Sequence, residues 1–345
     1  MASDMLGSSV VCRKSRLGSG RKVHAKNLKC VKRRRLFLES LEDRALMAAL
    51  YWDPDGNTTN NNLTTGAGLG GAGTWNTSSA GRWVDSSNNP VTWTNGNEAV
   101  FWGTSTAAKT VTVTTVSASA ITLKTTGYTL GSSTLTLTSP ATITTETGVS
   151  ATISSVVAGS AGLSKVGTGT LTLSGTNTYA GTTSLGGGTL IASNNAALGS
   201  SAVANSTIVS DGATLDVRAS IAEPLSIAGA GVGGTTGALV SGSSGSVSGA
   251  VSLAGDVSLG GTGTLTISGA VSGGFGLTKV GGGRTALNGT NTYTGITTVE
   301  GGTLQLGRRS SLYNAATASW TDGNITVNSG ATQRREPFLA RVKKS

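Results

Sequence analysis

The stretch from Gly276 to Gly307, GLTKVGGGRTALNGTNTYTGITTVEGGTLQLG, decides the fold because it occurs twice. The earlier copy runs from Gly162 to Ser193, GLSKVGTGTLTLSGTNTYAGTTSLGGGTLIAS, and is identical at 18 of 32 aligned positions. In both copies short runs of Leu, Val, Thr and Ser are separated by glycines, and the runs tend to alternate apolar with hydroxylated residues. A period of two predicts half-buried β-strands, and the glycines predict the turns between them.

Each copy contains three or four short strands, too few to bury their apolar side chains alone. Stacked coils would pair each strand with its equivalents above and below at about 4.8 Å. We therefore expect an all-β fold, a right-handed parallel β-helix (solenoid). The apolar residues expected inside are Leu171, Leu173, Leu185 and Leu190 in the first copy, and Leu287, Val299, Leu304 and Leu306 in the second.

Several shared positions of the two copies are expected to be structural. Gly175 and Gly289 are expected at corners that need a positive φ. Asn177 and Asn291 are expected to form side-chain ladders or turn hydrogen bonds inside the stack. The tyrosines are expected in the core or at corners rather than against a ligand. The full set is Gly162, Lys165, Gly175, Asn177, Tyr179, Gly188 and Leu190, with Gly276, Lys279, Gly289, Asn291, Tyr293, Gly302 and Leu304.

Composition and charge agree with a β-rich body between two basic ends. Glycine is 52 of 345 residues and charged residues are 12%, about half the usual fraction. Residues 1–44 carry twelve Lys or Arg against four Asp or Glu, and residues 334–345 carry five against one. The near-neutral body predicts no nucleic-acid partner. With no run of 18 apolar residues, no transmembrane helix is expected.

Four regions follow from these patterns. Residues 1–50 form a basic leader, partly helical or disordered, and residues 51–110 form Trp-rich N-terminal β coils. Residues 111–333 form the β-helix with repeats at 162–193 and 276–307, and residues 334–345 form a charged tail. The five tryptophans of the second region are expected to stack in a core column, each burying about 200 Å². The alternative is an aromatic platform for carbohydrate. The five are Trp52, Trp75, Trp83, Trp93 and Trp102.

The residues that most often carry catalysis are scarce in the body. His24, Cys12 and Cys30 are the only histidine and cysteines, and all three lie in the leader. A Ser-His-Asp triad, a cysteine nucleophile and a His-based zinc site are thereby excluded from residues 51–333. We expect no enzyme, no cofactor and no metal site.

Two acidic clusters are weaker candidates for chemistry. Asp211 and Asp216, with Arg218 nearby, are the candidates for a polysaccharide lyase or hydrolase, although Asp211 sits where Asp routinely forms turns. Asp53–Asn57 resembles the start of a calcium loop. Thr58 and Thr64 stand where that loop needs Gly and Glu, which favours a simple turn.

The two copies resemble the autotransporter-associated β-strand repeat, also called the passenger-associated transport repeat. The likeness rests on the lysine, on Asn-Thr-Tyr and on Gly-Thr-Leu at their expected spacing. It implies a right-handed parallel β-helix in a bacterial passenger domain exported to the cell surface.

The leader carries resemblances of its own. Leu38–Ala48, LESLEDRALMA, is similar to the LEPR-x-LL leader motif of planctomycete surface proteins, with Asp43 in place of Pro and Met47 in place of the last Leu. Arg34–Leu38 resembles a twin-arginine export motif. Acidic residues interrupt the apolar stretch that should follow it.

The leading functional hypothesis is a secreted, cell-surface or outer-membrane passenger with a structural or adhesive role. Its extended Thr/Ser/Asn face would meet cell-surface glycans or other envelope proteins. One alternative is a polysaccharide-active enzyme on the same fold. Another is a truncated, non-functional fragment of a larger autotransporter-like protein, because a charged tail follows Thr332 where the repeat predicts an apolar strand. Nucleic-acid binding through residues 13–35 would require that the leader is retained.

Overall fold

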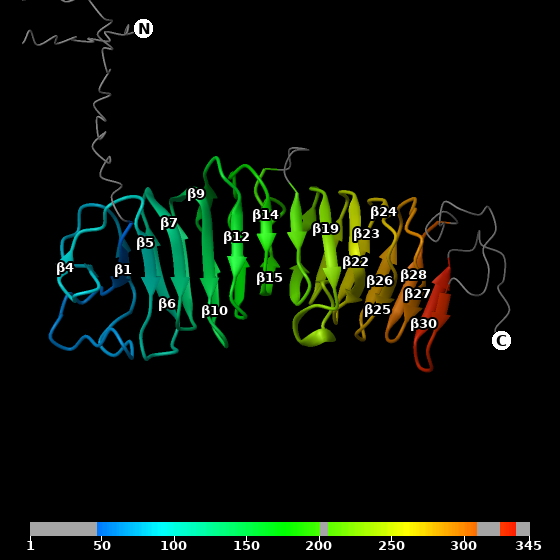
Figure 1. The fold of residues 1–345 in the computed structure, drawn as a ribbon, viewed down its shortest axis with the longest axis horizontal. Coiled ribbons are helices and arrows are strands. Elements are labelled where there is room, and N and C mark those ends of the chain that lie inside the picture. Colours follow the sequence, from blue (N-terminus) through cyan, green and yellow to red (C-terminus); the bar gives the residue numbers. More distant parts are fainter. Residues whose placement is uncertain (1–46, 201–205, 309–324, 336–345) are drawn as a thin grey trace, which may run out of the picture. The chain divides into compact units, whose positions relative to one another are not determined.

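The structure, a computed structural model, describes residues 47–200, 206–308 and 325–335. Apart from one short 3-10 helix, η1 (Val232–Gly234), the regular elements of this part are β-strands. The strands follow one another in successive coils, each beside the next (Figure 1). Neighbouring coils pair in parallel, so the prediction of an all-β parallel solenoid is confirmed.

One ladder of parallel strands links the coils from first to last. Each strand in it pairs with the next, and β11 (Val156–Ala158) and β24 (Val271–Ser272) add to it at the start of β9 and β22. The ladder consists of β1 (Ala49–Trp52), β5 (Glu98–Phe101), β7 (Val116–Leu123), β9 (Thr134–Thr145), β12 (Leu163–Val166), β14 (Thr183–Leu185), β16 (Thr207–Val209), β19 (Leu225–Gly229), β22 (Val251–Gly260), β25 (Leu277–Lys279), β27 (Thr297–Val299) and β29 (Ile325–Val327).

Two further ladders complete the coils. The first serves the N-terminal half and consists of β2 (Gly73–Trp75), β6 (Lys109–Val113), β8 (Tyr128–Ser132), β10 (Ser150–Ile153), β13 (Thr170–Leu173), β15 (Gly188–Ala192), β17 (Ala213–Val217) and β20 (Leu239–Val240). The second consists of β18 (Ser220–Ile221), β21 (Ser244–Val247), β23 (Thr264–Ile267), β26 (Arg284–Leu287), β28 (Thr303–Leu306) and β30 (Thr332–Arg335).

Each copy of the duplicated unit spans parts of two stacked coils. Ala151 pairs with Leu171, and Leu171 pairs with Leu190, so one coil takes about 20 residues. Within the first copy β12 pairs with β14 and β13 with β15. Within the second copy β25 pairs with β27 and β26 with β28. Each copy therefore contributes paired strands to two neighbouring coils.

The core lies inside the coils and follows the alternation of the sequence. In β13 and β28 intermediate and buried residues alternate one by one. All eight apolar residues expected inside are buried, each with 1% or less of its surface exposed. Full burial of a Leu or Val side chain contributes about 1.5–3 kcal/mol, so these columns are a main source of stability.

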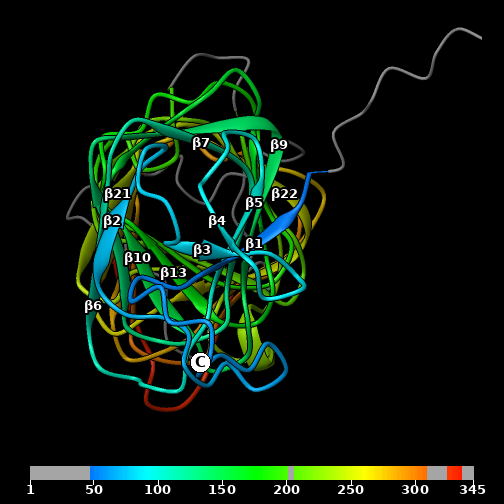
Figure 2. The same cartoon turned by 90° about the vertical axis from the view of Figure 1, so that its left-hand side faces the viewer.

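The N-terminal end of the solenoid is closed by tryptophans. β3 (Trp83–Val84) pairs antiparallel with β1, and β4 (Pro90–Val91) pairs antiparallel with β3. Figure 2 shows both strands turned across the end of the coil. Trp52, Trp75, Trp83 and Trp93 are buried there, with ring centres of contacting pairs 4.7–5.4 Å apart. We call these four residues the Trp plug.

The expected column of five stacked tryptophans is therefore wrong, although the expected core packing holds for four of the five. Four pairs of tryptophan rings are in contact within the plug, and three of these pairs meet edge to face, the geometry that ring quadrupoles favour. In the middle of the stack, each coil is covered by its neighbours on both sides. The first coil has a neighbour on one side only, and the Trp plug covers its apolar side chains on the other. Trp102 stays partly exposed, with Lys124 Nζ 4.1 Å from its ring centre.

The last described coil brings a polar residue into register with the core. Gln333 of β30 pairs with the buried Leu304 of β28. Val327 on β29 is 42% exposed. Residues 1–46 of the expected leader (1–50) and residues 336–345 of the expected tail (334–345) lie outside the described residues. The described remainder of each includes strand residues, because β1 begins at Ala49 and β30 ends at Arg335.

Candidate functional site

The repeat lysines are buried ties between coils. Lys165 has no exposed surface, and its Nζ donates hydrogen bonds to the carbonyl oxygens of Val166 (3.1 Å), Gly167 (2.8 Å) and Gly187 (3.0 Å). Gly187 belongs to the following coil, so the ammonium group joins two coils at a corner. Burial lowers the pKa of Lys165 to about 8, which leaves the group mostly charged at neutral pH.

The second copy reproduces this arrangement atom for atom. Lys279 is also fully buried, and its Nζ donates to the carbonyl oxygens of Val280 (2.7 Å), Gly281 (2.9 Å) and Gly301 (3.1 Å). Burial lowers its pKa to about 8 as well. Three charge-assisted bonds offset the cost of burying the ammonium group.

The repeat asparagines connect each coil to its neighbours through the backbone. Asn177 Oδ1 accepts a hydrogen bond from the Val157 N–H (2.9 Å), and its Nδ2 donates to the Ala197 carbonyl (2.6 Å). These partners lie 20 residues before and 20 residues after it. Asn291 Oδ1 accepts in the same way from the Val271 N–H (2.9 Å). Asn177 thus spans three successive coils.

The repeat tyrosines lie inside the solenoid. The hydroxyl of Tyr179 is 2.7 Å from Thr183 Oγ1, and that of Tyr293 is 2.6 Å from Thr297 Oγ1. Both rings are buried, and burial raises the pKa of Tyr293 to about 12 and that of Tyr179 further still. These contacts satisfy polar groups in the core and leave neither hydroxyl at the surface.

The prediction of a positive φ at Gly175 and Gly289 is wrong. Neither residue is among the glycines with positive φ, whereas Gly188 (φ 66°) and Gly302 (φ 62°) are. A Cβ on Gly175 would lie 2.1 Å from the Ser155 carbonyl oxygen of the preceding coil. These two positions need glycine because backbones of stacked coils approach closely there.

The remaining repeat positions fill similar packing roles. A Cβ on Gly162 would lie 2.0 Å from the Thr182 carbonyl oxygen, and one on Gly276 would lie 3.0 Å from that of Ile296. Leu190 and Leu304 have no exposed surface. The structure places these residues at coil contacts and in the core.

The acidic candidates for catalysis are engaged with the protein itself. Asp216 is 6% exposed, and its Oδ2 accepts from Arg218 Nε (2.9 Å) and Nη2 (2.7 Å). Its Oδ1 accepts from the Gly242 N–H (2.8 Å). Asp211 begins a turn, as predicted. The pair Asp216 and Arg218 therefore fastens β17 to the next coil.

The segment that resembles a calcium loop forms a turn. The Gly56 N–H donates to the Asp53 carbonyl (3.2 Å), and the Asn57 N–H donates to Asp55 Oδ1 (2.8 Å). Asp53 is fully buried, and its Oδ2 accepts from Asn61 Nδ2 (2.8 Å). Burial raises the pKa of Asp53 to about 6. The described residues hold no group of three His, Cys, Asp or Glu that could bind a metal ion.

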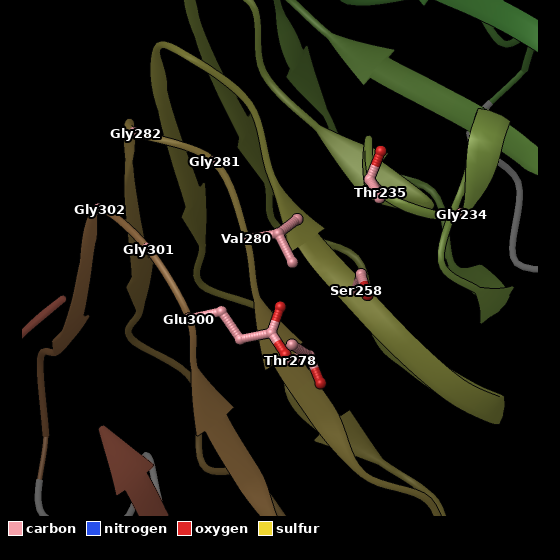
Figure 3. Close-up of a pocket in the computed structure, with 10 residues that line it drawn as sticks. All are labelled: Gly234, Thr235, Ser258, Thr278, Val280, Gly281, Gly282, Glu300, Gly301 and Gly302. Atoms are coloured by element: carbon pink, nitrogen blue, oxygen red, sulfur yellow. The ribbon is translucent and has the colours of Figure 1, made fainter. Parts of the chain in front are cut away.

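A groove on the side of the second copy is a candidate binding site. Its volume is about 480 Å³, and five glycines, three hydroxyl-bearing residues, Val280 and Glu300 line it. Figure 3 shows the Glu300 side chain, just after β27, close to Thr278, with Ser258 on the next strand and Thr235 beyond it. Ser258 and Thr278 are paired residues of β22 and β25. Thr235 comes from the loop that contains η1.

The groove marks a difference between the two copies. Glu300 stands where the first copy has Gly186, as one of the 14 aligned positions that differ. The loop between β19 and β20, which supplies Gly234 and Thr235, lies beside the second copy. Sequence reasoning missed this site because it stressed what the copies share. The only signal was a charged residue at a position where the other copy has none.

These features define a class: a parallel β-helix built from duplicated pairs of coils and tied together by buried polar side chains. Residues 163–192 and 277–306 match the passenger-associated-transport-repeat family, one residue inside the predicted bounds at each end. These two segments are therefore autotransporter-associated repeats, and the chain contains two copies of them.

One curated relative carries an informative name. The adhesin BmaC autotransporter of Brucella suis biovar 1 (strain 1330) is 44% identical over 133 residues. The match covers 36% of this chain and 4% of the relative. No solved structure matches the chain. In the described part, no helix is long and apolar enough to span a membrane.

Proposed function

We propose that this chain is part of a passenger that is secreted or displayed on the cell surface, where its β-helix has a structural or adhesive role. The observation that carries the proposal is the pair of passenger-associated repeats, whose buried Lys, Asn and Tyr contacts are reproduced from one copy to the other. The name of the BmaC relative supports the adhesive role. Because the chain spans 4% of that relative, its partners are proposed from its own surface.

The outer faces of the coils suit contact with a neutral, hydrogen-bonding surface. Thr110, Thr129, Thr152 and Thr172 pair with one another in series along the ladder that contains β6, β8, β10 and β13, and each is at least partly exposed. Such a row presents one hydroxyl per coil, about 4.8 Å apart. Each hydroxyl both donates and accepts, so glycans or other envelope proteins are suitable partners.

Export and adhesion are tested separately. An antibody raised against the full chain should label intact cells of the producing organism, or detect the chain in the medium, without permeabilisation. Purified full chain should be retained on cell layers above an albumin control. Detection only after lysis would reject the surface location. Retention no greater than that of albumin would reject the adhesive role and leave a structural one.

A further inference from the structure

The groove beside Glu300 excludes apolar ligands. Its volume of about 480 Å³ falls within the range of about 300–1,000 Å³ found for small-molecule sites. Val280 is the one apolar side chain among the residues that line it. A site for a fatty or aromatic ligand would need a mainly apolar wall. The ligand must therefore be polar.

A bound cation is also disfavoured, because the backbone oxygens nearest the groove are already used. Three of the lining residues, Val280, Gly281 and Gly301, direct their carbonyl oxygens at Lys279 Nζ. A metal ion is held by several oxygen ligands, and here one carboxylate and scattered hydroxyls remain. The buried ammonium group behind the floor would repel a cation as well.

An anionic ligand is disfavoured by the opposite charge. Glu300 lies at the groove with an exposed carboxylate, and none of the residues that line it is basic. Sites for carboxylates or phosphates normally present Arg, Lys or backbone N–H groups at a helix N-terminus. Charge therefore leaves neutral polar molecules as the class that fits.

We propose that this groove is a binding subsite for a neutral saccharide, and this proposal rests on the adhesive role proposed above. Glu300 would accept hydrogen bonds from sugar hydroxyl groups. Thr235, Ser258 and Thr278 would donate and accept others, from two coils and one loop. The glycine floor allows a sugar ring to lie close to the backbone.

The first repeat provides a natural control for this site. Its lysine corner has the same contacts, but Gly186 replaces Glu300. Substituting Glu300→Gly thus recreates a coil that already folds elsewhere in the chain. Gly186 can accept a side chain, because its φ is not positive and a Cβ there would meet nothing closer than 3.7 Å. Gly186→Glu is therefore the matched variant, with the carboxylate but without the η1 loop.

The test applies labelled full chain to an array of immobilised neutral, amino and acidic oligosaccharides, followed by titration with the best-bound sugar. We expect retention on neutral oligosaccharides, and a loss of affinity of at least about tenfold in Glu300→Gly, since hydrogen bonds to a charged group are worth that much. Combining Gly186→Glu with Glu300→Gly should not restore binding. Circular dichroism should remain unchanged in all variants.

Three results would overturn the proposal: no neutral oligosaccharide bound, binding confined to charged sugars, or equal affinity in wild type and Glu300→Gly. Cell adhesion separates this failure from failure of the proposed function. If the array shows no Glu300-dependent binding of neutral sugars but wild type and Glu300→Gly both adhere to cells, the groove proposal fails while the adhesive role stands. If neither adheres but the array still shows Glu300-dependent binding, the groove proposal stands and the adhesive role fails.

Discussion

Lys165 and Lys279 are fully buried, and each donates hydrogen bonds to three backbone carbonyl oxygens at a corner between coils. We predict that Lys279→Met lowers the free energy of unfolding by about 3 kcal/mol, because methionine fills the space but leaves those acceptors unpaired. Lys165→Met should cost a similar amount. Urea denaturation at pH 7 followed by circular dichroism measures both. Lys124→Met, which removes a partly exposed ion pair, is the control and should cost less than about 1 kcal/mol. Equal midpoints for all three would contradict the buried tie.

The buried carboxyl group of Glu223 should make the free energy of unfolding depend on pH. Its side chain is 2% exposed, and burial raises its pKa from 4.5 to about 7. Below pH 4.5 the carboxyl group is protonated in both the folded and the unfolded chain. Its titration then does not change the free energy of unfolding. Between pH 4.5 and 7 the carboxyl group of Glu223 is ionised in the unfolded chain but still protonated in the folded chain. The free energy of unfolding therefore falls as the pH rises, by about 3 kcal/mol in all. Glu223→Gln should therefore raise the urea midpoint at pH 8 and leave it unchanged at pH 4. A stabilising effect at pH 4 would reject this account.

Stacking of coils depends on how closely their backbones approach. A Cβ at Gly175 would overlap the Ser155 carbonyl at 2.1 Å, whereas a Cβ at Gly186 would make ordinary contacts at 3.7 Å. We predict that Gly175→Ala lowers the unfolding free energy by about 1–3 kcal/mol, since the coils must separate to admit the methyl group. Gly186→Ala should be neutral or raise it by up to about 1 kcal/mol. Thermal unfolding of the two variants compares them, and a Gly175→Ala protein as stable as Gly186→Ala would disprove the close approach.

Elements with a regular period were predictable, and contacts between coils were not. Alternation located strands such as β13 and β28, and duplication located the paired coils. β3 and β4 have two residues each, which is too short to show a period. The role of Gly175 and the groove at Glu300 depend on which residue of one coil faces which residue of the next. That register is set by loop lengths summed over a whole coil, and a single sequence does not reveal it.

The solenoid as a whole behaves as a one-dimensional stack, in which each coil mainly contacts its two neighbours. Trp83→Ala should therefore open the Trp plug at a cost of about 3–5 kcal/mol, and the damage should stay near the N-terminal end. Hydrogen exchange read by mass spectrometry should show lost protection in β1 and β5 while β23 and β26 remain protected. The control is Trp102→Ala, which removes a partly exposed ring and should alter exchange little. A uniform loss of protection along the chain would contradict independent coils.

The lysine and asparagine ties also determine how the protein would respond to a pull along the axis of the stack. The coils are loaded in series, so the weakest contact between neighbouring coils yields first and the others relax. A tie that joins two coils raises the yield force at that joint alone. The two repeats would then act as reinforced joints in a tether, and the chain would lengthen in steps of about one coil rather than rupture at once.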